Sequence, residues 1–169
     1  NGSTTEDLDN IGAGTYTVVV TDVNGCTISA SVEITESDAL AISTSVSDYN
    51  GVGVSCNGAT DGSIDVLVTG GTGEYTYSWS NGSTTEDLNN IGAGTYSLVV
   101  TDVNGCTISA SVDITESDAL AISTTASDYN GVGVSCNGAT DGSIDVLVTG
   151  GTGEYTYSWS NGSTTEDLD

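Results

Sequence analysis

The sequence repeats itself with a period of 80 residues, and this period constrains the fold more than any other feature. Residues 1–89 align with residues 81–169, and only seven of the 89 aligned pairs differ. A period of this length is too long for one turn of a solenoid, but it suits one small β-sandwich domain. We therefore expect a string of similar domains rather than a continuous stack.

Polar stretches such as Thr115–Asp118 end each unit and place the boundaries near Asp38 and Asp118. Residues 38–118 then form one complete β-sandwich repeat. Residues 1–37 form the C-terminal part of the repeat before it, and residues 119–169 form the N-terminal part of the repeat after it. The sequence starts and stops inside a unit, so we expect it to be a window on a longer array.

Within the complete unit, apolar and polar residues alternate with the period of two that is typical of half-buried strands. Turn signals separate the strands, namely Asn-Gly and Asp-Gly pairs and the string Gly70-Gly71-Thr72-Gly73. No segment keeps a period of 3.6 residues for three helical turns. We therefore predict an all-β fold, with about seven strands per unit arranged as a two-sheet sandwich. The expected inward-facing residues are Leu40, Ile42, Val46, Ile64, Val66, Val68, Tyr75, Tyr77, Trp79, Leu88, Ile91, Tyr96, Leu98, Val100, Ile108, Ala110, Val112 and Ile114.

The charge of the chain excludes most enzyme classes. It has 24 aspartates and glutamates and no lysine, arginine or histidine, which gives a formal charge of −24. Without lysine or histidine there is no Schiff base, no Ser-His or Cys-His dyad and no imidazole metal ligand. A polyanion also has no means of binding nucleic acid by counterion release. No apolar stretch approaches the roughly 20 residues that span a bilayer, so no membrane insertion is expected in this segment.

Two long strings resemble the SprB repeat, a tandem repeat of giant surface adhesins in gliding bacteria of the flavobacterial type. They are SCNGATDGSIDVLVTGGTGEYTYSWSNGSTTEDL at 55–88 and IGAGTYSLVVTDVNGCTISASVDITES at 91–117. The resemblance implies an immunoglobulin-like or PKD-like fold, export to the cell surface by the type IX route, and an adhesive stalk or filament. The sequence departs from the family pattern at Glu74, where relatives often carry proline, and this changes only the local turn.

Trp79 and Trp159 are the most conspicuous aromatic residues. Trp79 is in phase with Tyr75 and Tyr77, which is typical of a core anchor in a β-sandwich. The alternative, an aromatic platform for a sugar, is the less favoured interpretation. The three Asn-Gly-Ser strings, at residues 1, 81 and 161, match a glycosylation sequon but are interpreted as hairpin turns.

Two acidic loops begin as calcium loops do, with oxygen ligands at alternate positions before a glycine. The distal bidentate glutamate of a full calcium loop is missing. The alternative is that aspartate and asparagine simply form turns by bonding to their own backbone. A chain without positive side chains relieves carboxylate repulsion only by dispersal of the charges, salt screening or bound cations, so calcium is the candidate cofactor and no other is expected. The candidate ligands are Asp22, Asn24, Asp48, Asn50, Asp102, Asn104, Asp128 and Asn130, together with Glu116 and Asp118 at the junction between units.

The four cysteines recur as alternating NGC and CNG strings. Exported small domains are where disulfides persist, so we predict that each unit is closed by a disulfide. Of the three possible pairings, Cys56 with Cys106 closes the complete unit and leaves Cys26 and Cys136 to partners outside the window. A geometric difficulty accompanies this pairing, because in an ordinary immunoglobulin topology the two loops lie at opposite ends of the domain.

The sequence therefore favours an extracellular structural and adhesive repeat at the cell surface, which supplies length and an anionic surface. The alternative is a module that binds polysaccharide weakly at each unit and gains from multivalency. An enzyme limited to carboxylate-pair chemistry is a distant third possibility, and no catalysis is expected. The expected partners are neighbouring repeats of the same chain, with like filaments or surface polysaccharide as further candidates. In a filament, residues 1–37 of one chain could also complete residues 119–169 of another by donor-strand pairing.

Overall fold

A computed structural model describes residues 2–169 and contains strands and turns with no helix in that range. The all-β, sandwich-like prediction is confirmed, and the immunoglobulin or PKD type stays a prediction. The strands are β1 (Gly14–Thr21), β2 (Thr27–Ile34), β3 (Ala41–Val46), β4 (Gly62–Thr69), β5 (Thr76–Trp79), β6 (Leu88–Ile91), β7 (Gly94–Thr101), β8 (Thr107–Ile114), β9 (Ala121–Ala126) and β10 (Ile144–Thr149).

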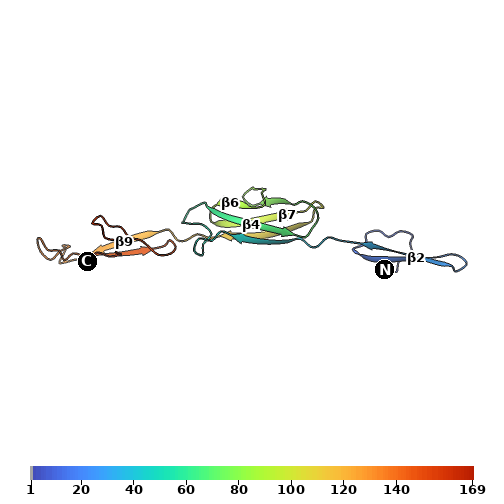
Figure 1. Cartoon of the computed structure of the whole chain (residues 1–169), viewed down its shortest axis with the longest axis horizontal. Helices are drawn as coiled ribbons and strands as arrows, with labels where there is room; N and C mark the ends of the chain where they lie inside the picture. The colour runs from blue at the N-terminus through green and yellow to red at the C-terminus, as the bar shows by residue number, and fades with distance from the viewer. Residues whose placement is uncertain (1) are drawn as a thin grey trace.

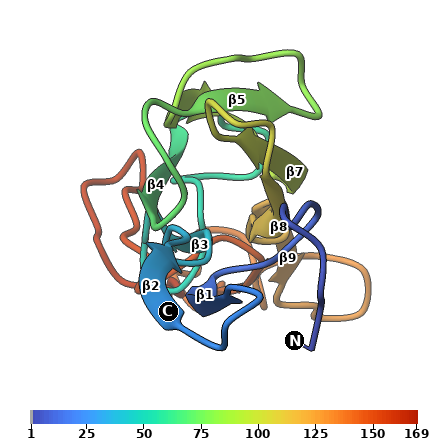
Figure 2. The same ribbon diagram turned by 90° about the vertical axis from the view of Figure 1, so that its right-hand side faces the viewer.

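Residues 38–118 contain two three-stranded antiparallel sheets, one in the order β3-β4-β6 and the other in the order β5-β7-β8. Figure 2 looks along the long axis and shows β3 and β4 on one side, with β5, β7 and β8 on the other. This unit has six strands rather than about seven, and the segment between β3 and β4 is folded as bends and turns.

The apolar core lies between these two sheets. Alternate residues of β4 are buried and the residues between them are more exposed, as the period of two predicts. Eleven buried hydrophobic residues form one cluster, and every one of them belongs to residues 38–118, so this unit holds a complete core of its own. They are Val54, Ile64, Val66, Val68, Trp79, Leu88, Ile91, Leu98, Val100, Val112 and Ile114.

The two ends of the chain repeat parts of this unit with the same register. Strands β1 and β2 pair Gly14 with Ile34, as β7 and β8 pair Gly94 with Ile114. Strands β9 and β10 likewise repeat the pairing of β3 and β4. The local hairpins therefore form from the same local sequence, whether or not a second sheet covers them.

The parts of the chain lie end to end. Figure 1 shows β1 and β2 at one end, the two-sheet unit in the middle, and β9 and β10 at the other end of an elongated molecule. The strands run roughly along this long axis, so the hairpins and loops of each unit lie at its two ends. The loops of one unit consequently meet the loops of the next.

Equivalent valines at the same repeat position provide a test of this core. Val100 is fully buried, whereas Val20, its counterpart in β1, is 57% exposed. We expect Val100→Ala to lower the free energy of unfolding by about 2 kcal/mol, because it removes two buried methyl groups and leaves a cavity. The matched control Val20→Ala should change it by less than about 0.5 kcal/mol. Chemical denaturation followed by tryptophan fluorescence, with Trp159 changed to phenylalanine so that Trp79 alone reports, measures both effects. Equal effects of the two substitutions would contradict this core.

Candidate functional site

The loops at the ends of each unit contain most of the predicted site residues. Asp102 lies in the β7–β8 hairpin and is only 5% exposed. Its Oδ1 accepts hydrogen bonds from the amides of Asn104 (3.0 Å) and Cys106 (2.8 Å). Its Oδ2 accepts a third bond from the amide of Thr72 (3.0 Å), so one carboxylate ties the hairpin to the glycine-rich loop after β4.

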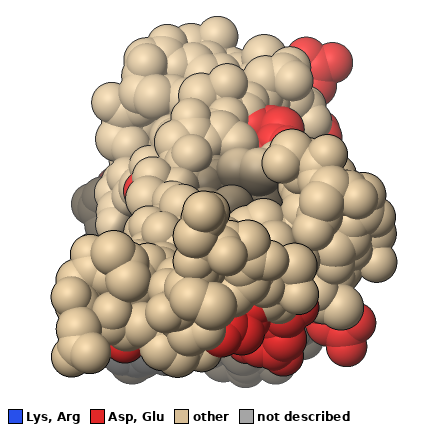
Figure 3. All heavy atoms as spheres, turned by 90° about the vertical axis from the view of Figure 1, so that its left-hand side faces the viewer, with Lys and Arg blue, Asp and Glu red and all other residues tan. Residues whose placement is uncertain are grey.

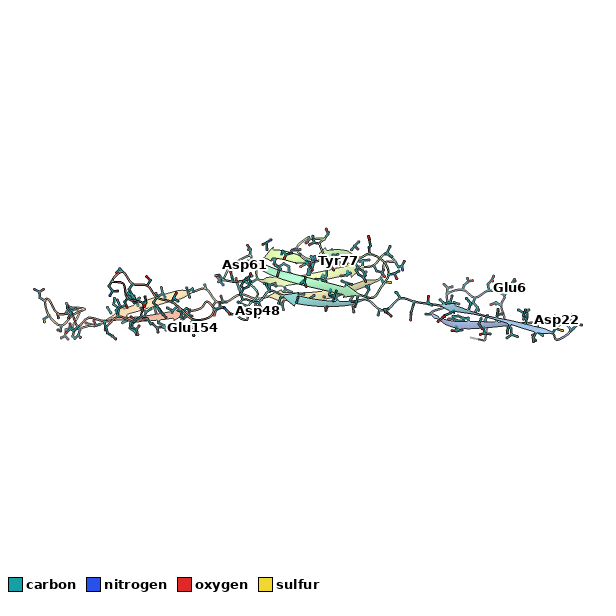
Figure 4. All side chains as sticks on the ribbon, in the orientation of Figure 1. Glu6, Asp22, Asp48, Asp61, Tyr77 and Glu154 are labelled. Atoms are coloured by element: carbon teal, nitrogen blue, oxygen red, sulfur yellow. The ribbon has the colours of Figure 1, made fainter. Side chains whose placement is uncertain are left out.

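Asp22 is the counterpart of Asp102 in the β1–β2 hairpin. Its Oδ1 accepts the same two bonds, from the amides of Asn24 (2.9 Å) and Cys26 (2.8 Å), but the residue is exposed. Figure 4 shows Asp22 at the tip of its hairpin, at the N-terminal end of the molecule. The comparison shows that the hairpin forms on its own, and that burial of its carboxylate depends on the glycine-rich loop.

Asp48 and Asn50 form a tight turn between β3 and β4. The amide of Gly51 donates to Asp48 Oδ1 (2.6 Å), and the amide of Tyr49 donates to the carbonyl of Val52 (2.7 Å). Asn50 and Gly51 both have positive φ, at 57° and 91°, which is the conformation that Asn-Gly favours at the centre of such turns. Asp128 and Asn130 repeat this turn. In both copies the predicted ligands act as turn residues.

The segment that joins β8 to β9 is hydrogen-bonded to the units on both of its sides. Towards the preceding unit, Glu116 Oε2 accepts from the amide of Gly58 (2.6 Å), and the side chain of Asn57 donates to the carbonyl of Ser117 (2.9 Å). Towards the following unit, the carbonyl of Asp118 accepts from the amide of Gly151 (2.8 Å). The same bond recurs from Gly71 to Asp38 (2.7 Å), so the joining segment is held in one repeated geometry.

Two further carboxylates were not singled out by the sequence, and both bond to backbone amides. Asp87 Oδ1 accepts from the amide of Val66 (2.9 Å) and so holds the loop before β6 against β4. Asp61 Oδ1 accepts from the amide of Ser55 (3.1 Å). Hydrogen bonds from the Ser55 side chain and backbone lower the pKa of Asp61 below its usual value. An aspartate just before a strand or a turn glycine is the only sequence signal for such bonds.

The calcium prediction remains a prediction. Within residues 2–169 no three or more histidine, cysteine, aspartate or glutamate side chains come together as a metal-binding group. The candidate ligands are spread over both ends of the units, and most of the carboxylates are bonded to backbone amides. Figure 3 views the end formed by residues 119–169 and shows acidic side chains at separate places on that face, with no basic ones.

Trp79 belongs to the core and is 3% exposed, and its indole Nε1 donates to the carbonyl of Thr85 (2.9 Å). Trp159 makes the same bond, to Thr165 (2.8 Å), but is only partly buried because β9 and β10 lack a second sheet. Tyr77 follows the same face of β5. The pKa of Tyr77 is raised to about 12, mainly by burial and next by the hydrogen bond to Glu86 and the negative charge of Glu86. Trp79 and Tyr77 therefore face the interior and do not present a platform for a sugar.

The four cysteines are exposed and are present as free thiols. Cys56 lies beside the end of β8, because the amides of Gly53 and Gly58 bond to Thr115 and Glu116. Cys106 immediately precedes the start of β8, whose eight residues (Thr107–Ile114) therefore separate the two cysteines. Eight residues of strand span about 26 Å, whereas the Cα atoms of a disulfide lie within about 7 Å. The predicted pairing of Cys56 with Cys106 inside one unit is therefore wrong, for the geometric reason already apparent in the sequence.

Fold and loops together define an all-β protein of tandem units whose ends carry tightly bonded, carboxylate-capped turns. The family model of the SprB repeat matches residues 52–84 and 132–164, so the chain contains SprB repeats, as the resemblance indicated. The two matched segments are 80 residues apart and cover the same part of consecutive units. No curated protein and no solved structure matches the chain. None of residues 2–169 forms a helix long and apolar enough to cross a membrane.

Asp102 and Asp22 allow the carboxylate cap to be tested in matched positions. Asp102→Ala should lower the free energy of unfolding by about 2 kcal/mol, because it removes three part-buried hydrogen bonds that the backbone amides make to a buried carboxylate. Asp22→Ala removes two exposed bonds whose amides water can solvate, and should cost less than about 1 kcal/mol. Hydrogen exchange of the Thr72 amide gives the specific readout. If this amide stays equally protected in Asp102→Ala, the cap does not hold the loop.

Calcium binding can be tested on the same chain. If the candidate ligands form specific sites, millimolar calcium should raise the melting temperature above the value in chelator, because a ligand of the folded state stabilises it by mass action. Magnesium at the same ionic strength is the control for a diffuse ion atmosphere. Equal melting temperatures in calcium and in magnesium would show that the carboxylates form no specific calcium site.

Proposed function

We propose that this chain is a segment of an extracellular surface protein, in which SprB repeats act as stiff spacer units of an adhesive stalk or filament. The observation that carries the proposal is the joining segment Thr115–Leu120, which is bonded to the unit behind it and to the unit ahead of it. A linker bonded on both sides transmits orientation from one unit to the next. Glycine-serine linkers, in contrast, behave as flexible coils.

The composition supports a spacer at the cell surface. All 24 charged side chains are negative, which disfavours association between neighbouring chains by self-repulsion. Each complete unit also buries its own core, so length is added without a new partner. The matching family is a structural repeat, and the proposal accordingly assigns no catalytic activity to the chain.

The test of the spacer function compares two double variants of the same composition. Asn57→Ala with Glu116→Ala removes the bonds between the joining segment and the unit behind it. Asn137→Ala with Glu36→Ala changes the equivalent residues, for which the described part of this chain holds no partner unit. We expect the first variant to broaden the distance distribution and shorten the mean length in small-angle X-ray scattering, because the junction becomes a hinge. The second variant should match the unchanged chain.

A binding experiment decides between the spacer and the multivalent polysaccharide module. Immobilised acidic and neutral polysaccharides should retain neither this chain nor a longer multi-unit fragment, if the repeats only provide length. Saturable retention that grows with the number of units would contradict the spacer proposal and support carbohydrate binding. Unequal scattering of the two double variants, without retention, supports the spacer.

A further inference from the structure

We infer that Cys56 forms a disulfide with the hairpin cysteine of the following unit, so that a covalent bond crosses the junction between neighbouring repeats. That hairpin cysteine is the counterpart of Cys106 in the next copy of the 80-residue unit. The inference rests on the tandem arrangement in the proposed function, and it adds a covalent bond to each junction. Two observations carry it: the position of Cys56 at the junction and the position of Cys106 within its own unit.

Cys56 lies where one unit meets the next. It lines a hollow of about 380 Å³ together with Asp118 and Ala119 of the joining segment, and with Gly151 and Thr152 of the following unit. Asn50 of the preceding unit also lies close to Gly153 of the following unit. A Cβ placed on Gly153 would lie 3.9 Å from Asn50 Nδ2. The glycine-rich loop of the following unit therefore faces the Cys56 end of the preceding one.

Cys106 is fixed to the same glycine-rich loop in its own unit. Asp102 accepts from the amide of Thr72 with one oxygen and from the amide of Cys106 with the other. The amide of Val103 also donates to the carbonyl of Thr72 (3.2 Å). The carboxylate of Asp102 thus links Thr72 to Cys106. The position of the glycine-rich loop therefore determines the position of the hairpin cysteine.

The repeat joins these two observations. Thr152 is the counterpart of Thr72, and its loop has the same local structure, since Gly70 and Gly150 both have a φ of 76°. When the following unit has its β7–β8 hairpin, that hairpin docks on Thr152 as Asp102 docks on Thr72. Its cysteine then lies at the junction hollow that Cys56 lines. The same relation places Cys106 against the end of the unit that precedes it.

The bond forms by ordinary thiol–disulfide exchange, and both cysteines are exposed and therefore accessible. The thiolate of one cysteine attacks a small-molecule disulfide, such as oxidised glutathione, and releases one reduced thiol. The second cysteine then displaces the remaining half as another thiol. The two protein thiols lose two protons and two electrons, and the oxidant is reduced to two thiols.

A two-unit protein tests the inference, made of residues 38–117 followed by residues 38–118. Residues 38–118 hold a complete core, and a cooperative melt with native Trp79 fluorescence confirms folding of each variant. Three variants each keep two cysteines and change the others to serine. The first keeps Cys56 of the first unit and Cys106 of the second. The control variants keep Cys56 and Cys106 of the same unit, or Cys106 of the first unit and Cys56 of the second.

The folded variants are equilibrated with oxidised and reduced glutathione, and intramolecular bonds are identified by mass spectrometry after alkylation. The junction variant should lose both free thiols, with an equilibrium constant for bridging about 100-fold above that of either control. Peptide mapping should join the CNG and NGC strings of different units. Free thiols in the folded junction variant, or equal bridging in all three, would overturn the inference. A junction that scatters as rigid but stays reduced would leave the spacer function intact and remove only the disulfide.

Discussion

The chain has no lysine, arginine or histidine, so no side chain of opposite charge can pair with its carboxylates. Backbone amides therefore become the main hydrogen-bond donors to these carboxylates. Asp102 shows the consequence most clearly, because its buried carboxylate is satisfied by three amides from two loops. A buried carboxylate without such bonds would carry a large desolvation cost. The pairing of carboxylate and amide therefore fixes the shape of the hairpin, and through Thr72 it fixes the loop that faces the neighbouring unit.

The same kind of bond recurs at each level of the molecule. Asp48 closes a tight turn, Asp87 holds a loop against β4, and Glu116 fastens the joining segment to the unit behind it. For Asp61, whose pKa is lowered in the folded chain, the contribution to stability is present above the unfolded pKa and is lost as the pH falls through the folded one. The acidic composition is thus part of the fold as well as of the surface.

Much of the architecture is predictable from the sequence. The 80-residue period identifies the repeating unit, and the alternation in Ile64, Val66 and Val68 identifies β4 and its inward face. The identification of the SprB repeat is confirmed at 52–84 and 132–164. These predictions succeed because they depend on local sequence, and local sequence also forms the two partial units in the same register.

The parts that depend on neighbours are not predictable from local sequence. Val20 and Val100 have nearly the same surrounding sequence, but only Val100 is buried, because only its strand packs against a second sheet. Asp102 and Asp22 differ in burial for the same kind of reason. The sequence predicts a Cys56–Cys106 disulfide because both cysteines belong to one unit. In the structure β8 separates them, because Cys106 precedes this strand and Cys56 lies beside its end. Cys56 lies at the contact between two units, and the sequence of one unit does not show which residues of the next unit are close to it.

If every junction repeats one fixed geometry, spin labels on the native cysteines should report a single distance across each of them. Cys26 with Cys106 and Cys56 with Cys136 are two pairs related by one repeat, so each label pair reports the displacement between neighbouring units. With the other two cysteines changed to serine, pulsed electron spin resonance should give a narrow distance distribution for each pair. Broad distributions would show that the units are joined by flexible linkers and not by a fixed junction.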